Sequence, residues 1–325
     1  MTRLAVDRRQ AIAYRLTTNH LDRRLPPKTY DEAARFAIQD TIPRSAQVSL
    51  HARVDDCEST AWADPRLIQT YSPRAAVHVF PVDDWAVYTV GRLPIDTAER
   101  EAIERGAERV CRALAGEERR GNTLPDGADA RGCCASGRVA IRWDARLTWV
   151  REVPAPEVDV VEARRELCRR HVRANGPTTP ETYAWWAGIA VADAHATWES
   201  LRAELIEVDL EDHTTWVMAA DEAALRSARP PRGVRLLPVE ELKLLGADRL
   251  GLFAGPTRKA VRAPADRYHP HVLLVDGEPA GAWGRRGGRV SVKLDGPVTP
   301  AVREQIEAEA LALPIPNATP SVRFV

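Results

Sequence analysis

Three consecutive polar residues, Gln39, Asp40 and Thr41, place an amide, a carboxylate and a hydroxyl at one point of the chain. They stand between two stretches that both have the pattern of a helix. An amide can accept a hydrogen bond from a water and orient it without being protonated, and a nearby carboxylate can act as a base or as an electrostatic partner. The triplet therefore predicts a site that holds a water against a sugar, and we take all three residues as candidate catalytic residues.

The elements on either side must position this triplet. Thr29 and Glu32 form a T-x-x-E capping box that predicts the start of the first helix, and Pro43 prevents that helix from running on. The second helix is expected over residues 44–54. Two helices that meet in this way are the core of a helix-turn-helix module. The other interpretation is structural: Gln39 and Asp40 would be a polar helix end, with Asp40 capping the following turn.

Several basic and polar side chains near the triplet are candidates for contacts with DNA. In the second helix, spacings of three and four put one set of polar residues on a shared side, away from the apolar positions. The candidate DNA-binding residues are Arg44, Gln47, His51, Arg53, Arg74, His78 and Arg142. The alternatives are a solvated helix face, a solvated strand face for Arg142, and a buried histidine with a structural hydrogen bond for His78.

Three similar passages follow one another, and each has helices and then a short β segment. We place the modules at residues 1–95, 96–155 and 156–228, with a C-terminal domain at residues 229–325. The clearest β segment is the hairpin of residues 138–143 and 147–151, the position of the wing in a winged helix. The prediction is an α+β protein with three tandem winged-helix modules and a small C-terminal antiparallel β domain.

The composition narrows the class of protein. The chain has 325 residues and zero formal net charge. An extensive nonspecific nucleic-acid-binding surface is therefore disfavoured, but a local basic site is not. No apolar run has the length of a membrane span, and the first ten residues lack the apolar core of a signal peptide. The five cysteines have no C-x-x-C spacing and are expected to be free thiols. We expect a monomeric, cytoplasmic, nucleoid-associated protein with no metal and no cofactor.

Five stretches, residues 38–54, 74–79, 175–188, 236–249 and 275–283, together resemble the tandem winged-helix DNA glycosylases typified by AlkZ and YcaQ (also called AlkX). They occur in the family's order and span nearly the whole chain. The family's catalytic signature is Gln-hydrophobic-Gln, or Gln-hydrophobic-Asp in a second branch. The aligned residues here keep the glutamine as Gln39 but have Asp40 in the middle and Thr41 in third place. The family's Phe-Asp pair is likewise replaced, by Glu240 and Glu241.

The resemblance implies hydrolysis of the N-glycosidic bond of purines alkylated at N7 or N3 in double-stranded DNA, which gives abasic sites. It also implies bulky or crosslinking natural-product adducts as substrates, with a possible role in self-resistance. No lysine lies near the triplet in the sequence, so a monofunctional enzyme without Schiff-base lyase chemistry is expected. The alternative from another class is a non-catalytic winged-helix DNA-binding protein, either a transcriptional regulator or a lesion-shielding factor.

Overall fold

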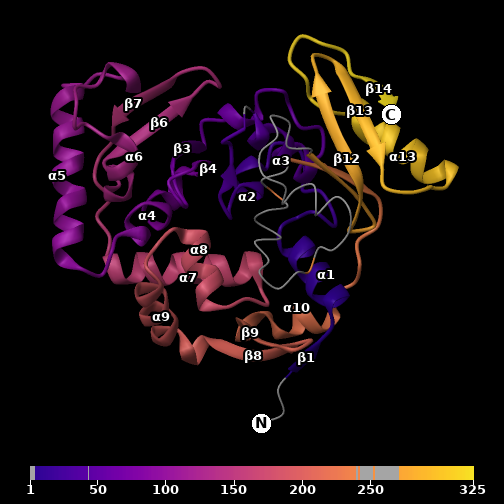
Figure 1. Cartoon of the computed structure of the whole chain (residues 1–325), viewed down its shortest axis with the longest axis horizontal. Helices are drawn as coiled ribbons and strands as arrows, with labels where there is room; N and C mark the ends of the chain where they lie inside the picture. The colour runs from indigo at the N-terminus through magenta and orange to yellow at the C-terminus, as the bar shows by residue number, and fades with distance from the viewer. Residues whose placement is uncertain (1–3, 43, 239–240, 242–251, 253–270) are drawn as a thin grey trace.

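The computed structural model describes residues 4–42, 44–238, 241, 252 and 271–325. Helices and three β-sheets alternate along the chain, so the fold is α+β. Figure 1 shows helix α5 at one end of the molecule and helix α13 at the other, with the N-terminal helices between them. None of the helices in the described ranges is long and apolar enough to cross a membrane.

The N-terminal part is built from short elements that contribute to several apolar clusters. Its helices and strands are β1 (Leu4–Val6), α1 (Arg8–Thr18), α2 (Tyr30–Ala33), β2 (Ile38–Gln39), α3 (Ser45–Arg53), β3 (Leu67–Tyr71), β4 (Val77–Pro81) and α4 (Trp85–Tyr88). Helix α3 packs its apolar side, including Ala46 and Leu50, against Ile38 and Val79 of the neighbouring strands. The strand β3 was not expected from the sequence.

The first helix of the expected pair is a single turn, and this corrects the position of the triplet. The Thr29 hydroxyl donates to the Pro26 carbonyl oxygen at 2.6 Å and makes no capping hydrogen bond, so the expected capping box does not form. The chain leaves α2 after Ala33, passes through Ala37 with a left-handed φ of 59°, and then extends as β2. Gln39 therefore lies in a strand that pairs with β4, and not at a helix end.

The first two passages share one six-stranded sheet, with strand order β2-β4-β3-β6-β7-β5. The second passage supplies α5 (Thr97–Leu114), β5 (Arg119–Arg120), α6 (Ala130–Cys133), β6 (Val139–Trp143) and β7 (Thr148–Glu152). Strands β6 and β7 form the hairpin that the sequence predicts. The two passages join where Gln69 of β3 pairs with Ile141 of β6, so the hairpin extends the sheet that carries Gln39.

The third passage packs its helices against a three-stranded sheet. Its elements are α7 (Val160–Asn175), α8 (Pro180–Ala187), α9 (Val191–Ser200), β8 (Leu205–Leu210), β9 (His213–Met218) and α10 (Glu222–Ser227). Thr179 caps α8 by accepting from the backbone N–H of Thr182. Strand β1 pairs with β8 in parallel, so the N-terminal residues complete this sheet.

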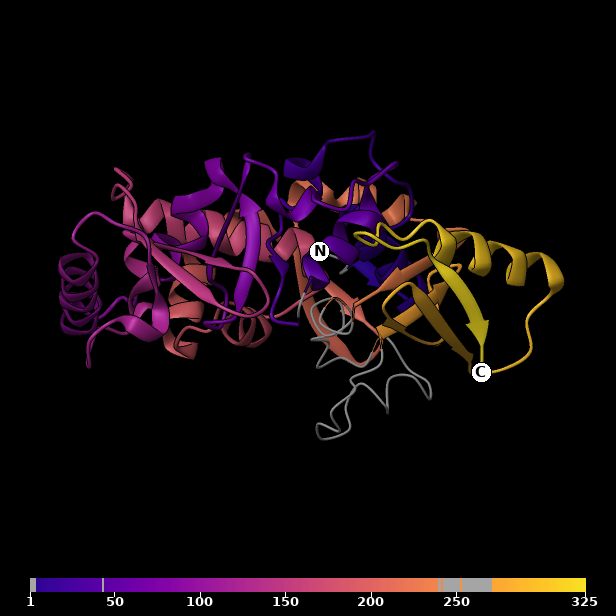
Figure 2. The ribbon, with the colours of Figure 1, turned by 90° about the horizontal axis from the view of Figure 1, so that it is seen from above.

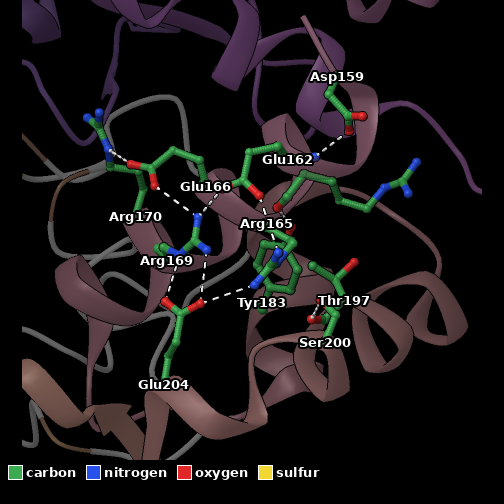
Figure 3. A network of polar contacts seen from close by, with 11 residues as sticks. Asp159, Glu162, Arg165, Glu166, Arg169, Arg170, Tyr183, Thr197, Ser200 and Glu204 are labelled. Atoms are coloured by element: carbon green, nitrogen blue, oxygen red, sulfur yellow. Dashed lines mark hydrogen bonds and ion pairs between the residues drawn. The ribbon is translucent and has the colours of Figure 1, made fainter.

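Ion pairs along α7 connect it to the segments around it, as Figure 3 shows. Arg169 donates to Glu204 at 2.8 and 2.9 Å, which joins α7 to the segment before β8. Arg170 donates to both carboxylate oxygens of Asp84, from the segment before α4. Helix α7 is therefore held to both the first passage and its own sheet.

The C-terminal part is a five-stranded sheet covered on one side by a helix. Its elements are β10 (Val234–Leu237), β11 (His271–Val275), β12 (Glu278–Arg286), β13 (Arg289–Leu294), α13 (Pro300–Leu311) and β14 (Ser321–Phe324). Seen from above, the yellow helix α13 lies against this sheet (Figure 2). The expectation of a purely antiparallel sheet is wrong: α13 connects β13 to β14 as a crossover, so β14 returns in the same direction and pairs in parallel.

Candidate active site

The amide of Gln39 is held at both ends by neighbouring side chains. Its Oε1 accepts from Arg74 Nη2 at 3.1 Å, and its Nε2 donates to Thr41 Oγ1 at 3.0 Å. Because a guanidinium has only donors, the Arg74 contact fixes which end of the amide is the oxygen. Gln39 is half-buried and Thr41 is exposed, so this chain of hydrogen bonds runs from the interior to the surface.

Arg74 is in turn fixed by the third passage. Its guanidinium stacks over the ring of Trp185 in α8, 4.2 Å from the ring centroid, and burial lowers the pKa of Arg74. The backbone of Arg74 passes so close to Gly188 that a Cβ at Gly188 would lie 2.7 Å from the Arg74 Cα. Glycine at the end of α8 therefore permits the approach that brings Arg74 to Gln39.

Asp40 points away from this chain, because successive residues of an extended strand face opposite sides. Its carboxylate is fully buried and accepts from the backbone N–H of Ala46 and from Gln69 Nε2, each at 3.0 Å. These contacts make Asp40 the acceptor for the first turn of α3. The structural interpretation of Asp40 as a cap matches this geometry, although the element before it is a strand.

Arg44 lies on the same side of the strand as Asp40. Its Nη1 is 3.8 Å from the Asp40 carboxylate and donates to the Trp143 carbonyl oxygen at 3.2 Å, and its guanidinium stacks 3.5 Å from the centroid of Trp62. Burial lowers the pKa of Arg44. The side chain is 24% exposed, so Arg44 links α3 to the hairpin and still reaches the surface.

Three of the candidate DNA-binding residues on α3 are internal, which corrects the expected polar face. Gln47 donates to the Glu58 carbonyl oxygen at 2.7 Å, and Arg53 donates to Glu241 at 2.5 Å. His51 lies 3.6 Å from Glu309 of α13, and burial lowers its pKa to about 4. Their exposed fractions are 5% for Gln47, 5% for His51 and 3% for Arg53, so these side chains have no surface to offer to DNA. The helix is covered on this side by other parts of the chain, which spacing within the helix could not reveal.

His78 is also internal. It pairs with Gln39 across the strands, is fully buried, and contacts the Ala76 carbonyl oxygen through Nδ1 at 3.0 Å. Burial lowers its pKa to about 3, so the ring is neutral. The structural alternative for this histidine therefore fits the geometry better than a contact with DNA.

Arg142 is exposed on the hairpin, where it binds Glu118 at 2.6 Å. It is well separated in the sheet from Gln39, since β6 and β2 are separated by β3 and β4. The structure thus joins Gln39, Thr41 and Arg74 by hydrogen bonds, while Arg44 lies against Asp40 and the hairpin and Arg142 lies farther along the sheet.

The partners that orient the site were missed from the sequence. Trp62, Gln69 and Trp185 come from three separate segments, and each contacts the triplet or an arginine beside it. No local pattern marks them, because their contacts depend on how the sheet and α8 meet. Within the described ranges, no group of three or more His, Cys, Asp or Glu side chains could hold a metal ion.

Comparisons with known proteins assign the family. The model of the AlkZ-like DNA glycosylases matches residues 34–314. Among solved structures, the DNA glycosylase AlkZ of Streptomyces sahachiroi superimposes with a TM-score of 0.80 and 18% sequence identity, over 99% of this chain and 100% of that chain. No curated protein matches the sequence. Because the family model covers most of the chain, this protein belongs to the AlkZ-like DNA glycosylase family.

Proposed function

We propose that this protein is a monofunctional DNA glycosylase that excises N7- or N3-alkylated purines by hydrolysis, with bulky or crosslinking adducts among its substrates and self-resistance as a possible role. The observation that carries the proposal is the hydrogen-bonded chain from Arg74 through Gln39 to Thr41. It holds a neutral amide and a hydroxyl side by side at the surface. Duplex DNA bearing the alkylated base would be the substrate, and the three helical passages would act as tandem winged helices on it.

Gln39 and Thr41 have the free acceptor capacity that a nucleophilic water requires. A carbonyl oxygen has two lone pairs, and Arg74 uses one lone pair of Gln39 Oε1. A hydroxyl oxygen also has two lone pairs, and Gln39 Nε2 uses one on Thr41. A water placed between them would donate to both oxygens, which turns its own lone pair toward the anomeric carbon.

The burial of Asp40 fits an alkylated base as leaving group. An N7- or N3-alkylated purine carries positive charge and departs without being protonated, so the enzyme needs to orient the water and stabilise an oxocarbenium-like sugar. Orientation by neutral groups is sufficient for such a substrate. Among the described lysines, Lys28 pairs with Glu58 and Lys293 lies on β13, which supports hydrolysis without a Schiff base.

The experiment compares wild type with Gln39→Ala on duplex DNA that contains N7-methylguanine or a bulky N7 adduct, and it quantifies abasic sites after base treatment. We expect excision by wild type and a loss of at least about a hundredfold in Gln39→Ala with DNA binding kept. Gln305→Ala, which removes an exposed amide from α13, is the matched control. Equal excision by Gln39→Ala and wild type would contradict the proposed site.

A non-catalytic DNA-binding protein is the second candidate. One observation favours it: the only carboxylate of the triplet is fully buried and bound as a helix cap. DNA binding by wild type without excision of any of these adducts would support this second candidate.

A further inference from the structure

One face of the C-terminal sheet carries four cations. Side chains alternate along each strand, and Trp283, Val290 and Val292 are buried among the residues that pack with α13. The residues between them point to the opposite face. On β12, β13 and β14 this face presents the exposed side chains of Arg286, Arg289, Lys293 and Arg323, which we call the basic strip.

The basic strip is not neutralised by the protein. No ion pair joins any of its four cations to a carboxylate in the part of the chain that the structure describes. By contrast, two arginines that reach this domain from the N-terminal part are paired with its carboxylates: Arg8 binds Glu278 at 2.9 Å and Arg24 binds Glu309 at 2.6 Å. Since the whole chain has zero net charge, the strip is a local excess of positive charge.

The register of the strands makes this arrangement of cations less stable. Arg286 lies directly opposite Arg289 across the β12–β13 pair. Like charges directly opposite one another destabilise a sheet. The neighbouring positions Gly284, Ser291 and Ser321 are small, so nothing bulky separates a long anion from the four cations. A group of unneutralised cations on neighbouring strands of one sheet face can contact several phosphates of a phosphodiester backbone.

We propose that the basic strip binds the phosphodiester backbone of duplex DNA and extends the protein's contact with DNA onto the C-terminal sheet. Arginine suits this role because its guanidinium can donate two parallel hydrogen bonds to a phosphate. The strip would give affinity without sequence preference. The inference rests on DNA being the substrate, but its test does not require excision.

The test is the salt dependence of binding to an undamaged duplex. The strip variant carries Arg289→Ala, Lys293→Ala and Arg323→Ala. The matched control carries Arg105→Ala, Arg109→Ala and Arg112→Ala on α5, with the same change of charge at exposed positions. Each lost phosphate contact lowers the slope of log Kd against log salt by about 0.9, so we expect the strip variant to lose about two to three in slope and on the order of tenfold or more in affinity at 0.1 M salt.

Excision measured with enzyme at saturation should stay at the wild-type rate in the strip variant, because the strip contacts backbone and not the reacting sugar. Thermal unfolding provides the folding check, and Tm should be unchanged or higher since Arg289 no longer faces Arg286. Wild-type slope and affinity in the strip variant would overturn the proposal, as would equal losses in both variants. A strip variant that is less soluble but binds DNA as wild type does would also overturn the proposal. It would indicate that the charges of the strip prevent strand pairing between molecules at the β14 edge. If wild type excises nothing yet the strip variant loses slope, the glycosylase proposal fails and the binding surface stands.

Discussion

Arg74 Nη2 donates to Gln39 Oε1 at 3.1 Å, while the Arg74 guanidinium rests on the ring of Trp185. Arg74 thus contacts α8 of the third passage and Gln39 on β2 of the first passage, so the orientation of the Gln39 amide depends on where α8 packs. A reacting water held by Gln39 would be placed by the packing between these two passages. We therefore propose that Arg74 acts as a positioning residue, in place of the DNA contact that the sequence predicts.

Replacement of Arg74 should lower the rate of excision more than it weakens binding. We expect Arg74→Ala to reduce kcat by roughly tenfold to a hundredfold, because an amide free to rotate places the water less accurately. Arg74→Lys should recover little, since an ammonium lacks the planar group that stacks on Trp185 and donates to Gln39 at once. Single-turnover kinetics on an N7-alkylguanine duplex would measure the effect. A raised KM with an unchanged kcat would instead support the DNA contact.

Thr41 should be required for its hydroxyl and not for its methyl group. Thr41→Val removes the acceptor for Gln39 Nε2 at nearly constant volume, and we expect a decrease in excision of about tenfold or more. Thr41→Ser keeps the oxygen and should stay within a few-fold of wild type. Thr41 is exposed, so neither change should alter Tm by much. Equal activity of the valine and serine variants would show that this hydroxyl does not hold the water.

The sequence predicts the elements that depend on local signals. A threonine followed by proline, as at Thr179 and Thr299, predicts the start of a helix, and α8 and α13 begin there. An Asp-Gly dipeptide predicts a tight hairpin turn, and Asp276-Gly277 joins β11 and β12. Each of these features depends on a few neighbouring residues, so it can be predicted without knowledge of the rest of the chain.

The surroundings of the triplet depend on distant parts of the chain, and the predictions made for them from the sequence were wrong. The Thr29 hydroxyl donates to the Pro26 carbonyl oxygen and does not cap a helix. The position of Gln39 is instead set by strand pairing with β4. His51 shares the spacing of an exposed face with Arg44 and Gln47, yet it lies against Glu309, more than two hundred residues along the chain, and Arg53 is paired with Glu241. No helical periodicity carries that information.

Asp40 should matter for stability more than for catalysis. Asp40→Ala leaves the Ala46 N–H and the Gln69 amide without their acceptor in a buried place, and we expect a loss of about 1–3 kcal/mol in the free energy of unfolding. Asp40→Asn keeps an oxygen for the cap and should keep most of the excision rate. Denaturant unfolding and single-turnover excision of the two variants would separate these roles. Loss of excision in a well-folded Asp40→Asn variant would identify Asp40 as a general base instead.

His51 should make stability depend on pH. Burial between α3 and α13, helped by Arg24 and Arg235 and opposed by Glu309, lowers the pKa of His51 to about 4 in the folded protein. In the unfolded chain the imidazole titrates near its ordinary value of about 6.5. Between these two values the unfolded state binds a proton that the folded state excludes, so the stabilisation is complete above pH 6.5 and is lost as the pH falls toward 4.

The difference between the two pKa values corresponds to about 3 kcal/mol at most for His51. The neutral buried rings of His78 and His171, whose pKa values burial lowers to about 3, act in the same direction. We expect Tm to fall steeply from pH 7 to pH 5 in wild type. His51→Gln, which cannot be protonated, should have a lower Tm at pH 7 but a shallower decline, whereas the exposed control His213→Gln should decline as wild type does. An equally steep decline in His51→Gln would show that the acid sensitivity arises elsewhere, because the proton uptake of that one ring would then be absent from both states.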